Sequence, residues 1–461
     1  MSDKRHESTS KPLNRAAPKG EAVTQVRTKL PFREKFAYFC VNIGNIPIMT
    51  LANSLLSFYY TEVLGMNPIA VGTLFLAARV FDGIDDPLTG FVIDHLRDSK
   101  FGKFRKVLLV GVTLCSLNYL VLWIGPAHAG GLQMAVAYVS YLLLGVTFSI
   151  MDIALNSMLP VLTSDLNERS KLSSVKVAGY GVGALACGVV APKLISVFGG
   201  GVRAYEIVIS IFVGIVLLFS VGGALGIRQR LTFENRENYH VKDLLRILAQ
   251  KPLLVTFGAS LVYGTGCAFA TTTNPYYAEH VLGKMDLMVW FTLSMAAGMI
   301  PVVFLAPPLT KRFGKKPVYG GGMILAGAGL LVRLIAPSSL PVVIVSCVLY
   351  GLGLAFCMVL FYGVQADNTD YIDFTMQKRS EGAVSATASM ITKISNGLGG
   401  ALPLYILGMT KTSAGTYSAA GLAISNAVLP AVLCLAGGLL FILKYPIKQS
   451  MLEEMRQIYE N

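Results

Sequence analysis

The stretch LAARVFDGIDDPLTGFVIDHLRDSKFGKFRK, residues 76–106, carries charged side chains inside an otherwise apolar segment. Arg79, Asp82, Asp85 and Asp86 stand close together where a membrane-spanning helix would carry no charge. A charged side chain at the centre of a bilayer costs about 2.5–3.5 kcal/mol on insertion scales, so a cluster of them indicates a functional site. Their spacing places the three carboxylates on one side of a helix, with Arg79 one turn earlier.

Carboxylates packed this closely cannot all stay ionised in a low-dielectric environment unless a cation joins them. We therefore expect the cluster to hold a proton or to coordinate Na⁺, so that its charge changes with occupancy. Pro87 follows the cluster and permits a bend in the helix. The alternative is a charge network with Arg79 that only locks helices together.

The chain as a whole has the composition of an all-α integral membrane protein. Of its 461 residues, 54% are hydrophobic and 14% are charged, with a mean hydropathy of +0.59, whereas soluble domains carry about 25% charged residues. About twelve apolar runs are each long enough to cross a hydrocarbon core of about 30 Å. They are predicted at residues 35–61, 68–94, 106–126, 132–163, 173–196, 204–226, 253–279, 285–308, 317–336, 341–366, 382–408 and 418–444.

The net charge of +13 follows the positive-inside rule and does not require a nucleic-acid partner. The basic residues cluster in loops that share one side of the membrane with both termini: Lys100, Lys103, Arg105, Lys106, Arg228, Arg230, Lys311, Arg312, Lys315 and Lys316. We therefore predict a multi-pass protein of the cell (inner) membrane with both termini in the cytoplasm.

The two halves of the chain resemble each other. DSKFGKFRKV follows the second run and KRFGKKPV follows the eighth, at the same place in each set of six. Such duplication is typical of a transporter architecture whose binding site lies between the halves; chance similarity between short basic loops is the alternative. The predicted organisation is a disordered basic cytoplasmic tail (1–33), a six-helix bundle (34–226), a cytoplasmic middle loop (227–251), a second six-helix bundle (252–445) and a cytoplasmic tail (446–461).

Further charged residues lie inside the later runs. Asp152 stands in the fourth run near Ser149, Lys176 in the fifth and Lys393 in the eleventh. Buried charges usually pair inside a bundle, so we expect Asp152 to pair with Lys176, and Lys393 with an acid or with substrate. Lys176 extending to the membrane surface is the alternative.

The seventh run is rich in hydroxyl and amide groups. Either it lines a hydrated cavity or its polar groups serve helix packing. These residues are Tyr263, Thr265, Thr271, Thr272, Thr273, Asn274, Tyr276 and Tyr277. The seven cysteines and five histidines show no metal-ligand spacing, and no phosphate-binding motif supports ATP-driven transport. We expect no enzyme activity, and no cofactor or metal beyond the coupling ion.

Several of these motifs carry a family resemblance. Six motifs follow one another along the chain in the family's order: FYYTEVLGM (58–66), the Asp-x-x-x-Asp-Pro of 82–87, GKFR (102–105), the Met-Asp of span four, VQADNTDYIDFTMQKRSEG (364–382) and the lysine of span eleven. The chain resembles the glycoside-pentoside-hexuronide:cation symporters from about residue 35 to 445. That resemblance implies a major facilitator fold of about twelve transmembrane helices and solute uptake driven by a Na⁺ or H⁺ gradient. It also implies a cation site at Asp82, Asp86 and Ser149, and substrate contact or helix coupling at Asp152 and Lys393.

The sequence departs from the family pattern at several positions. Asp85 stands where the family usually has Asn, and this third carboxylate favours H⁺ while leaving Na⁺ open. Ile46 replaces the family aspartate that binds galactoside hydroxyls, and Asn156 and Met358 replace tryptophans. A galactoside is therefore a poor fit, and with both lysines retained we expect an anionic glycoside such as a uronide or a sulfonated sugar.

We therefore predict a monomeric, alternating-access symporter of a sugar or organic anion, in contact with membrane lipid. Its cation would bind at Asp82, Asp85, Asp86 and Ser149. Substrate binding or coupling is predicted for Arg79, Asp152, Asn156, Lys176, Lys393, Asn274 and Tyr276. A cytoplasmic gate is predicted at Asp94, Arg97, Lys103, Arg105 and Arg379. The alternatives are a transporter-like solute sensor or scaffold, and a lysolipid or organic-anion transporter of the same fold.

Overall fold

The computed structural model describes residues 30–96, 102–163, 166–229, 249–376, 381–410, 417, 421–422, 424–447 and 451. The first half is built from helices α1 (Phe32–Leu51), α2 (Pro68–His95), α3 (Lys103–His128), α4 (Gln133–Leu162), α5 (Leu166–Val197) and α6 (Val202–Gly226). The second half is built from α8 (Lys251–His280), α9 (Met288–Met299), α10 (Val302–Phe313), α11 (Lys315–Leu331), α12 (Leu340–Met376), α13 (Glu381–Thr410) and α15 (Leu429–Lys444).

Short helical segments extend several of these helices. Three of them are π-helical: η1 (Ala52–Leu56), η2 (Tyr59–Val63) and η6 (Ile424–Val428). The others are 3₁₀ turns: η3 (Gly130–Leu132), η4 (Met285–Leu287) and η5 (Val332–Leu334). Most of the middle loop and both tails predicted from the sequence lie outside the described residues.

Within the described part of the chain, nine helices are long and apolar enough to cross a membrane, and the bent pair of α9 and α10 brings this to ten. Helices α2 and α13 are 28 and 30 residues long but carry charged and polar side chains. The bend between α9 and α10 is 42° and falls at Pro301, because a proline in mid-helix removes a hydrogen bond. The predicted span at 285–308 is therefore two helices.

The start of α2 is fixed by its own sequence. The Asn67 side chain accepts a hydrogen bond from the backbone N–H of Ile69 at 2.9 Å, and Pro68 occupies the first helical position. The preceding helix ends on an aromatic cluster, in which the Tyr59 ring lies 4.6 Å from that of Tyr205. This ring contact holds η2, which lies between α1 and α2 in the chain, against α6.

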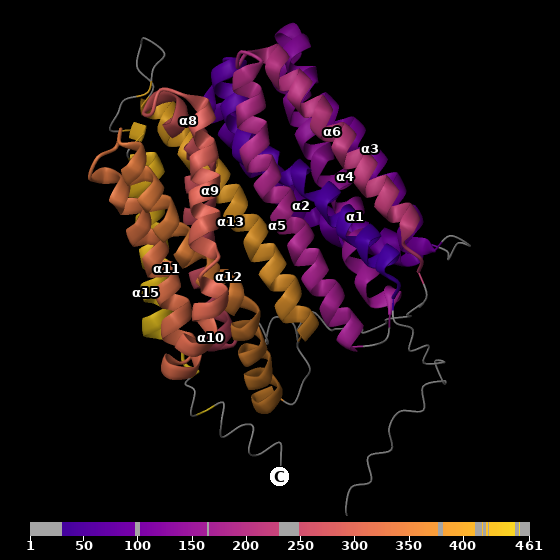
Figure 1. Ribbon diagram of the computed structural model, residues 1–461, viewed down its shortest axis with the longest axis vertical. Helices are drawn as coiled ribbons and strands as arrows, with labels where there is room; N and C mark the ends of the chain where they lie inside the picture. Colours follow the sequence, from indigo (N-terminus) through magenta and orange to yellow (C-terminus); the bar gives the residue numbers. More distant parts are fainter. Residues whose placement is uncertain are drawn as a thin grey trace, which may run out of the picture.

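The two halves lie side by side, with the first half in indigo to magenta and the second in orange to yellow (Figure 1). Helix α2 packs on α13, and α5 packs on α9. Thr73 of α2 and Tyr405 of α13 are hydrogen bonded at 2.8 Å, and Thr292 of α9 donates to the Gly188 carbonyl of α5 at 3.2 Å. A Cβ on Gly188 would lie 2.7 Å from the Thr292 side chain, so glycine permits this close approach.

A polar cluster joins the halves where α1 ends. Glu62 accepts a hydrogen bond from the Tyr417 hydroxyl at 2.6 Å, and its other oxygen lies 2.9 Å from Nε2 of His280. The hydroxyls of Thr61 and Tyr276 are 2.6 Å apart beside it. Glu62 and Thr61 belong to the first half, and their three partners to the second. The molecule is therefore closed at the end opposite the basic loops.

Candidate transport site

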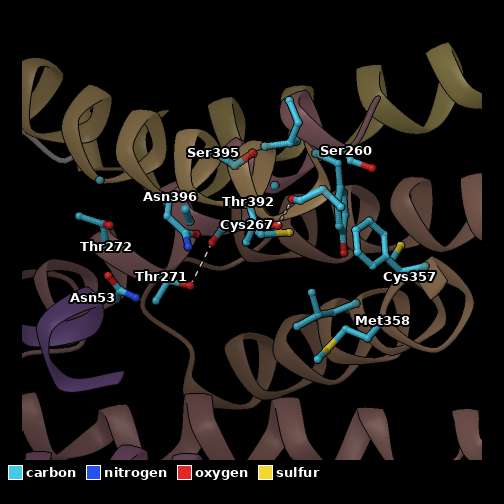
Figure 2. Close-up of a pocket in the computed structure, with 18 of the residues that line it drawn as sticks. Asn53, Ser260, Cys267, Thr271, Thr272, Cys357, Met358, Thr392, Ser395 and Asn396 are labelled. Atoms are coloured by element: carbon cyan, nitrogen blue, oxygen red, sulfur yellow. Dashed lines mark hydrogen bonds between the residues drawn. The ribbon is translucent and has the colours of Figure 1, made fainter. Parts of the chain in front are cut away.

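A cavity of about 460 Å³ lies between the halves. Its wall combines amides, hydroxyls and aromatic rings: Asn53, Ser260, Thr271, Thr272, Thr392, Ser395, Asn396, Phe75, Tyr141, Phe257, Tyr263, Tyr319, Tyr350, Phe361 and Tyr362. Figure 2 shows Asn53 facing Thr271 and Thr272, with Asn396 and Thr392 beside them. The cavity extends to the early residues of α8, so it is placed toward the end that carries the basic loops.

Arg79 is the only charged side chain among the described residues that line this cavity. Its Nη1 donates to Asp82 Oδ2 at 2.9 Å and its Nη2 donates to the Tyr141 hydroxyl at 3.4 Å. Asp82 is buried, and a Cβ on Gly145 of α4 would lie 2.4 Å from its Oδ1. Glycine at position 145 therefore makes room for the carboxylate. The predicted ion pair between Arg79 and the cluster is present.

Asp85 faces a different neighbourhood from Asp82. Its Oδ1 accepts a hydrogen bond from Thr89 at 3.2 Å, and its Oδ2 is buried without a hydrogen-bond partner among the described residues. It lines a second cavity, bounded by α2, α3 and α4. Asp82 and Asp85, which were predicted on one side of the helix, thus contact different groups.

The structure gives less detail for Ser149 and Asp86, the other two members of the predicted cation site. Ser149 is buried on α4, one turn beyond Gly145. Asp86 lies on α2, and its side chain is outside the described structure. The buried Asp85 oxygen without a partner among the described residues, on a carboxylate bonded to the Thr89 hydroxyl, suits a proton or a hard cation such as Na⁺.

Asp152 anchors a second polar group on the inner side of the first half. It accepts hydrogen bonds from Asn156 at 2.8 Å and from Asn45 at 3.4 Å. Lys176 donates to the amide oxygen of Asn156 and lies over the Tyr180 ring. The predicted pair of Asp152 and Lys176 is therefore bridged by Asn156.

The charge of Lys393 on α13 also acts on Asp152, so both predicted lysines lie near this acid. Lys176 of the first half and Lys393 of the second half therefore both lie near this carboxylate. Because Asn156 is exposed, the group is open to a solute.

Asn274 and Tyr276 are positioned as structural residues by their contacts. Arg333, with 1% of its surface exposed, donates to Asn274 at 3.1 Å and to Asn426 of η6, and lies over the Phe291 ring. Tyr276 is buried and bonded to Thr61, as described above. Neither residue lines the central cavity.

The predicted gate is described in part. Arg97 and Arg379 lie outside the described residues, as does the side chain of Asp94. Arg105 donates to the Leu225 carbonyl at 2.7 Å, and so ties the start of α3 to the end of α6. Lys103 begins α3 and lies over the Phe104 ring.

Near the same end, Glu168 bonds Lys35 of α1 at 2.6 Å and Lys171 at 2.9 Å. Glu168 precedes the membrane-spanning part of α5, which begins at Lys171. The hydrogen bond from Lys35, followed by that from Lys171, lowers the pKa of Glu168 from 4.5 to about 2. The carboxylate is therefore charged at neutral pH and holds α1 to α5.

Sequence reasoning did not select several residues of the central cavity. Thr392, Ser395 and Asn396 lie beside the selected Lys393 on α13, and Asn53 lies on η1. The signal was the same one that singled out the seventh run, namely hydroxyl and amide groups inside an apolar span. Tyr362 has no such signal, because aromatic residues are common in any membrane helix.

Comparison with known proteins agrees with this architecture. Residues 37–449 match the model of the MFS/sugar transport protein family, and the chain belongs to that family. A proposed sulfoquinovose importer of Escherichia coli strain K12 is 28% identical over 387 residues, which is 81% of each chain. The isoprimeverose transporter of Lactiplantibacillus pentosus is 28% identical over 401 residues, or 85% of this chain and 82% of that one.

Two further matches extend the comparison. A glucuronide carrier protein homolog of Escherichia coli strain K12 is 25% identical over 83% of this chain and 84% of its own. Among solved structures, a mutant form of nucleoside transporter NupG superimposes with a TM-score of 0.64 at 13% identity, covering 88% of this chain and all of that one. The protein is a multi-pass membrane protein with the major facilitator fold. It is a secondary transporter of sugars, not an enzyme.

Proposed function

We propose that this protein is a symporter that takes up an anionic sugar together with H⁺ or Na⁺. The observation that carries the proposal is the charge balance between the halves. Lys176 and Lys393 both act on Asp152, which leaves one positive charge beside the exposed Asn156. A carboxylate or sulfonate on the solute supplies the missing negative charge, and the names of two relatives refer to a sulfonated sugar and a glucuronide.

The cavity between the halves, which these two lysines do not line, suits a sugar ring. Asn53, Thr271 and Asn396 offer hydrogen bonds to hydroxyl groups, and Phe361 and Tyr362 offer ring faces for its apolar surface. These aromatic residues come from α12. They supply a stacking surface in place of the tryptophans that Asn156 and Met358 replace.

Coupling between cation binding and solute binding follows from the position of Arg79. Its guanidinium contacts Asp82 in the predicted cation site and also lines the cavity between the halves. A cation at the cluster weakens the hold of Asp82 on Arg79 and makes the guanidinium more available to an anionic solute. Because such coupling is reciprocal, the solute strengthens cation binding by the same factor.

The positive-inside rule orients this mechanism in the membrane. The loops that begin α3 and α11 are basic, so we place them and both termini in the cytoplasm of a cell that carries the protein in its inner membrane. The closed end at Glu62 then faces outward. In this arrangement the described conformation delivers solute to the cytoplasm.

The test is uptake by proteoliposomes under an imposed Na⁺ or pH gradient. We expect accumulation of a hexuronide or a sulfonated hexose, and little accumulation of a neutral glycoside of the same size. Lys176→Gln and Lys393→Gln should each reduce uptake at least tenfold, whereas Lys284→Gln, at an exposed lysine outside the site, serves as the matched control. Equal uptake of neutral and anionic sugars would refute the substrate class, and saturable binding without flux would indicate a sensor.

A further inference from the structure

The second cavity, of about 500 Å³, lies on the outer side of the first half. It is bounded by α2, α3 and α4, and its wall is mainly apolar: Leu88, Val92, Ile93, Leu96, Val107, Val110, Val146 and Ile150. Leu88 and Val92 are 59% and 58% exposed, and Val110 is 49% exposed. Because these apolar side chains are exposed on helices that span the membrane, we take the cavity to open toward the hydrocarbon of the bilayer.

Charged residues lie at the two ends of this cavity. Lys103 and Lys106 stand almost one turn apart at the start of α3, and both line the cavity. Asp85 lines its other end, ten residues before α2 ends at His95, which is about 15 Å along a helix axis. The two cations are thus at the membrane surface, and the carboxylate is deep and separated from them.

We propose that this cavity binds an anionic phospholipid of the cytoplasmic leaflet. Lys103 and Lys106 hold the headgroup phosphate, and an acyl chain lies along the apolar side chains of α2 and α3. Basic pockets between transmembrane helices on the cytoplasmic side are suited to anionic headgroups, and the surface charge of that leaflet adds to the attraction. A neutral lipid fills the apolar wall equally well but gains nothing from the lysines.

The proposed lipid site is separate from the cavity between the halves, although it shares Asp85 with the predicted cation site. Of the residues that line the second cavity, none lines the cavity between the halves. Asp85 connects the two regions through the helix that also carries Asp82 and Arg79. A lipid chain in the second cavity covers the outer face of Asp85 and separates it from the bilayer.

The experiment is native mass spectrometry of the delipidated protein, titrated with phosphatidylglycerol or with phosphatidylcholine of the same acyl chains. Each lysine near an anionic headgroup is worth about fivefold in affinity, so two lysines predict about a thirtyfold preference for phosphatidylglycerol. Lys103→Gln with Lys106→Gln should remove that preference and leave the affinity for phosphatidylcholine unchanged. Free inorganic phosphate should not compete, because it lacks the acyl chain.

Two further variants make the result specific. Lys311→Gln with Arg312→Gln removes two exposed charges from the last turn of α10 in the second half and should keep the preference. Val110→Trp fills the groove and should weaken both lipids. The proposal is overturned if the variant lacking Lys103 and Lys106 still prefers phosphatidylglycerol, if the wild type binds both lipids equally, or if Val110→Trp changes neither affinity. A thermal unfolding scan of each variant shows that it is folded.

Discussion

The ion pair of Arg79 and Asp82 allows the structural and transport roles of the charged cluster to be separated. The two side chains are only 11% and 10% exposed, and their atoms approach to 2.9 Å. Removing one member of a buried pair leaves a buried charge without compensation, which costs about 3–5 kcal/mol. We therefore expect Arg79→Gln and Asp82→Asn each to lower the free energy of unfolding by that amount.

The double variant should behave differently. Replacing both charges by amides removes the uncompensated charge, and exchanging a whole buried pair is often close to neutral. Its free energy of unfolding should then lie within about 1 kcal/mol of the wild type, which corresponds to an interaction energy of several kcal/mol in a double-mutant cycle. Chemical unfolding in detergent micelles measures all four proteins under one condition.

Transport should not follow stability in this series. The double variant lacks the carboxylate that we assign to the cation and the guanidinium that lines the cavity, so it should fold yet fail to accumulate solute against a gradient. If the double variant instead loses as much free energy of unfolding as the two single variants together, the two charges do not interact. Normal uphill uptake by the double variant would show that neither group takes part in coupling.

Three other predictions address separate parts of the molecule. Glu62→Gln weakens the charge-assisted hydrogen bonds that Glu62 forms with Tyr417 and His280 at the closed end. An impermeant maleimide added outside should then label Cys267 in the central cavity about fivefold faster. An unchanged labelling rate would show that these bonds do not keep that end closed. Arg333→Met removes the buried hydrogen bonds that Arg333 donates to Asn274, Asn426 and Ser346, and should cost about 3 kcal/mol of stability without changing KM. A change in KM alone would place Arg333 in the site instead. Lys35 and a second lysine lower the pKa of Glu168 from 4.5 to about 2, so its charge stabilises the fold above pH 4.5 and this contribution disappears as pH falls toward 2. The stability difference between wild type and Glu168→Gln should therefore shrink over that interval, and a constant difference would exclude the ion pairs as its source.

The helical architecture was predictable because a chain in hydrocarbon must satisfy its backbone within each span. Length and hydropathy therefore located most helices. The bend between α9 and α10 was not predicted, although Pro301 marks it in the sequence. A proline in a membrane helix is compatible with either a straight or a broken span, and packing decides between them.

Contacts between polar residues were predictable within one helix but not between helices. The pairing of Arg79 with Asp82 was expected from a spacing of three residues within one helix. The bridge from Lys176 through Asn156 to Asp152 joins two helices and depends on their relative rotation. The placement of Asn274 beside the buried Arg333 depends on four separate segments, and no pattern within one span encodes it.

The sequence by itself determined that this protein crosses the membrane many times, and it predicts two similar halves and a functional role for the charged residues inside the spans. The membrane spans and the prediction for the charged residues follow from the cost of placing charge in hydrocarbon, which acts on every residue separately. Only the tertiary structure decided that Asp85 lines a cavity that Asp82 does not line, and that α12 and α13 supply much of the wall of the cavity between the halves. The physical reason is that a side chain's partners across helices are set by how the helices rotate and pack, and that packing is a property of the whole fold.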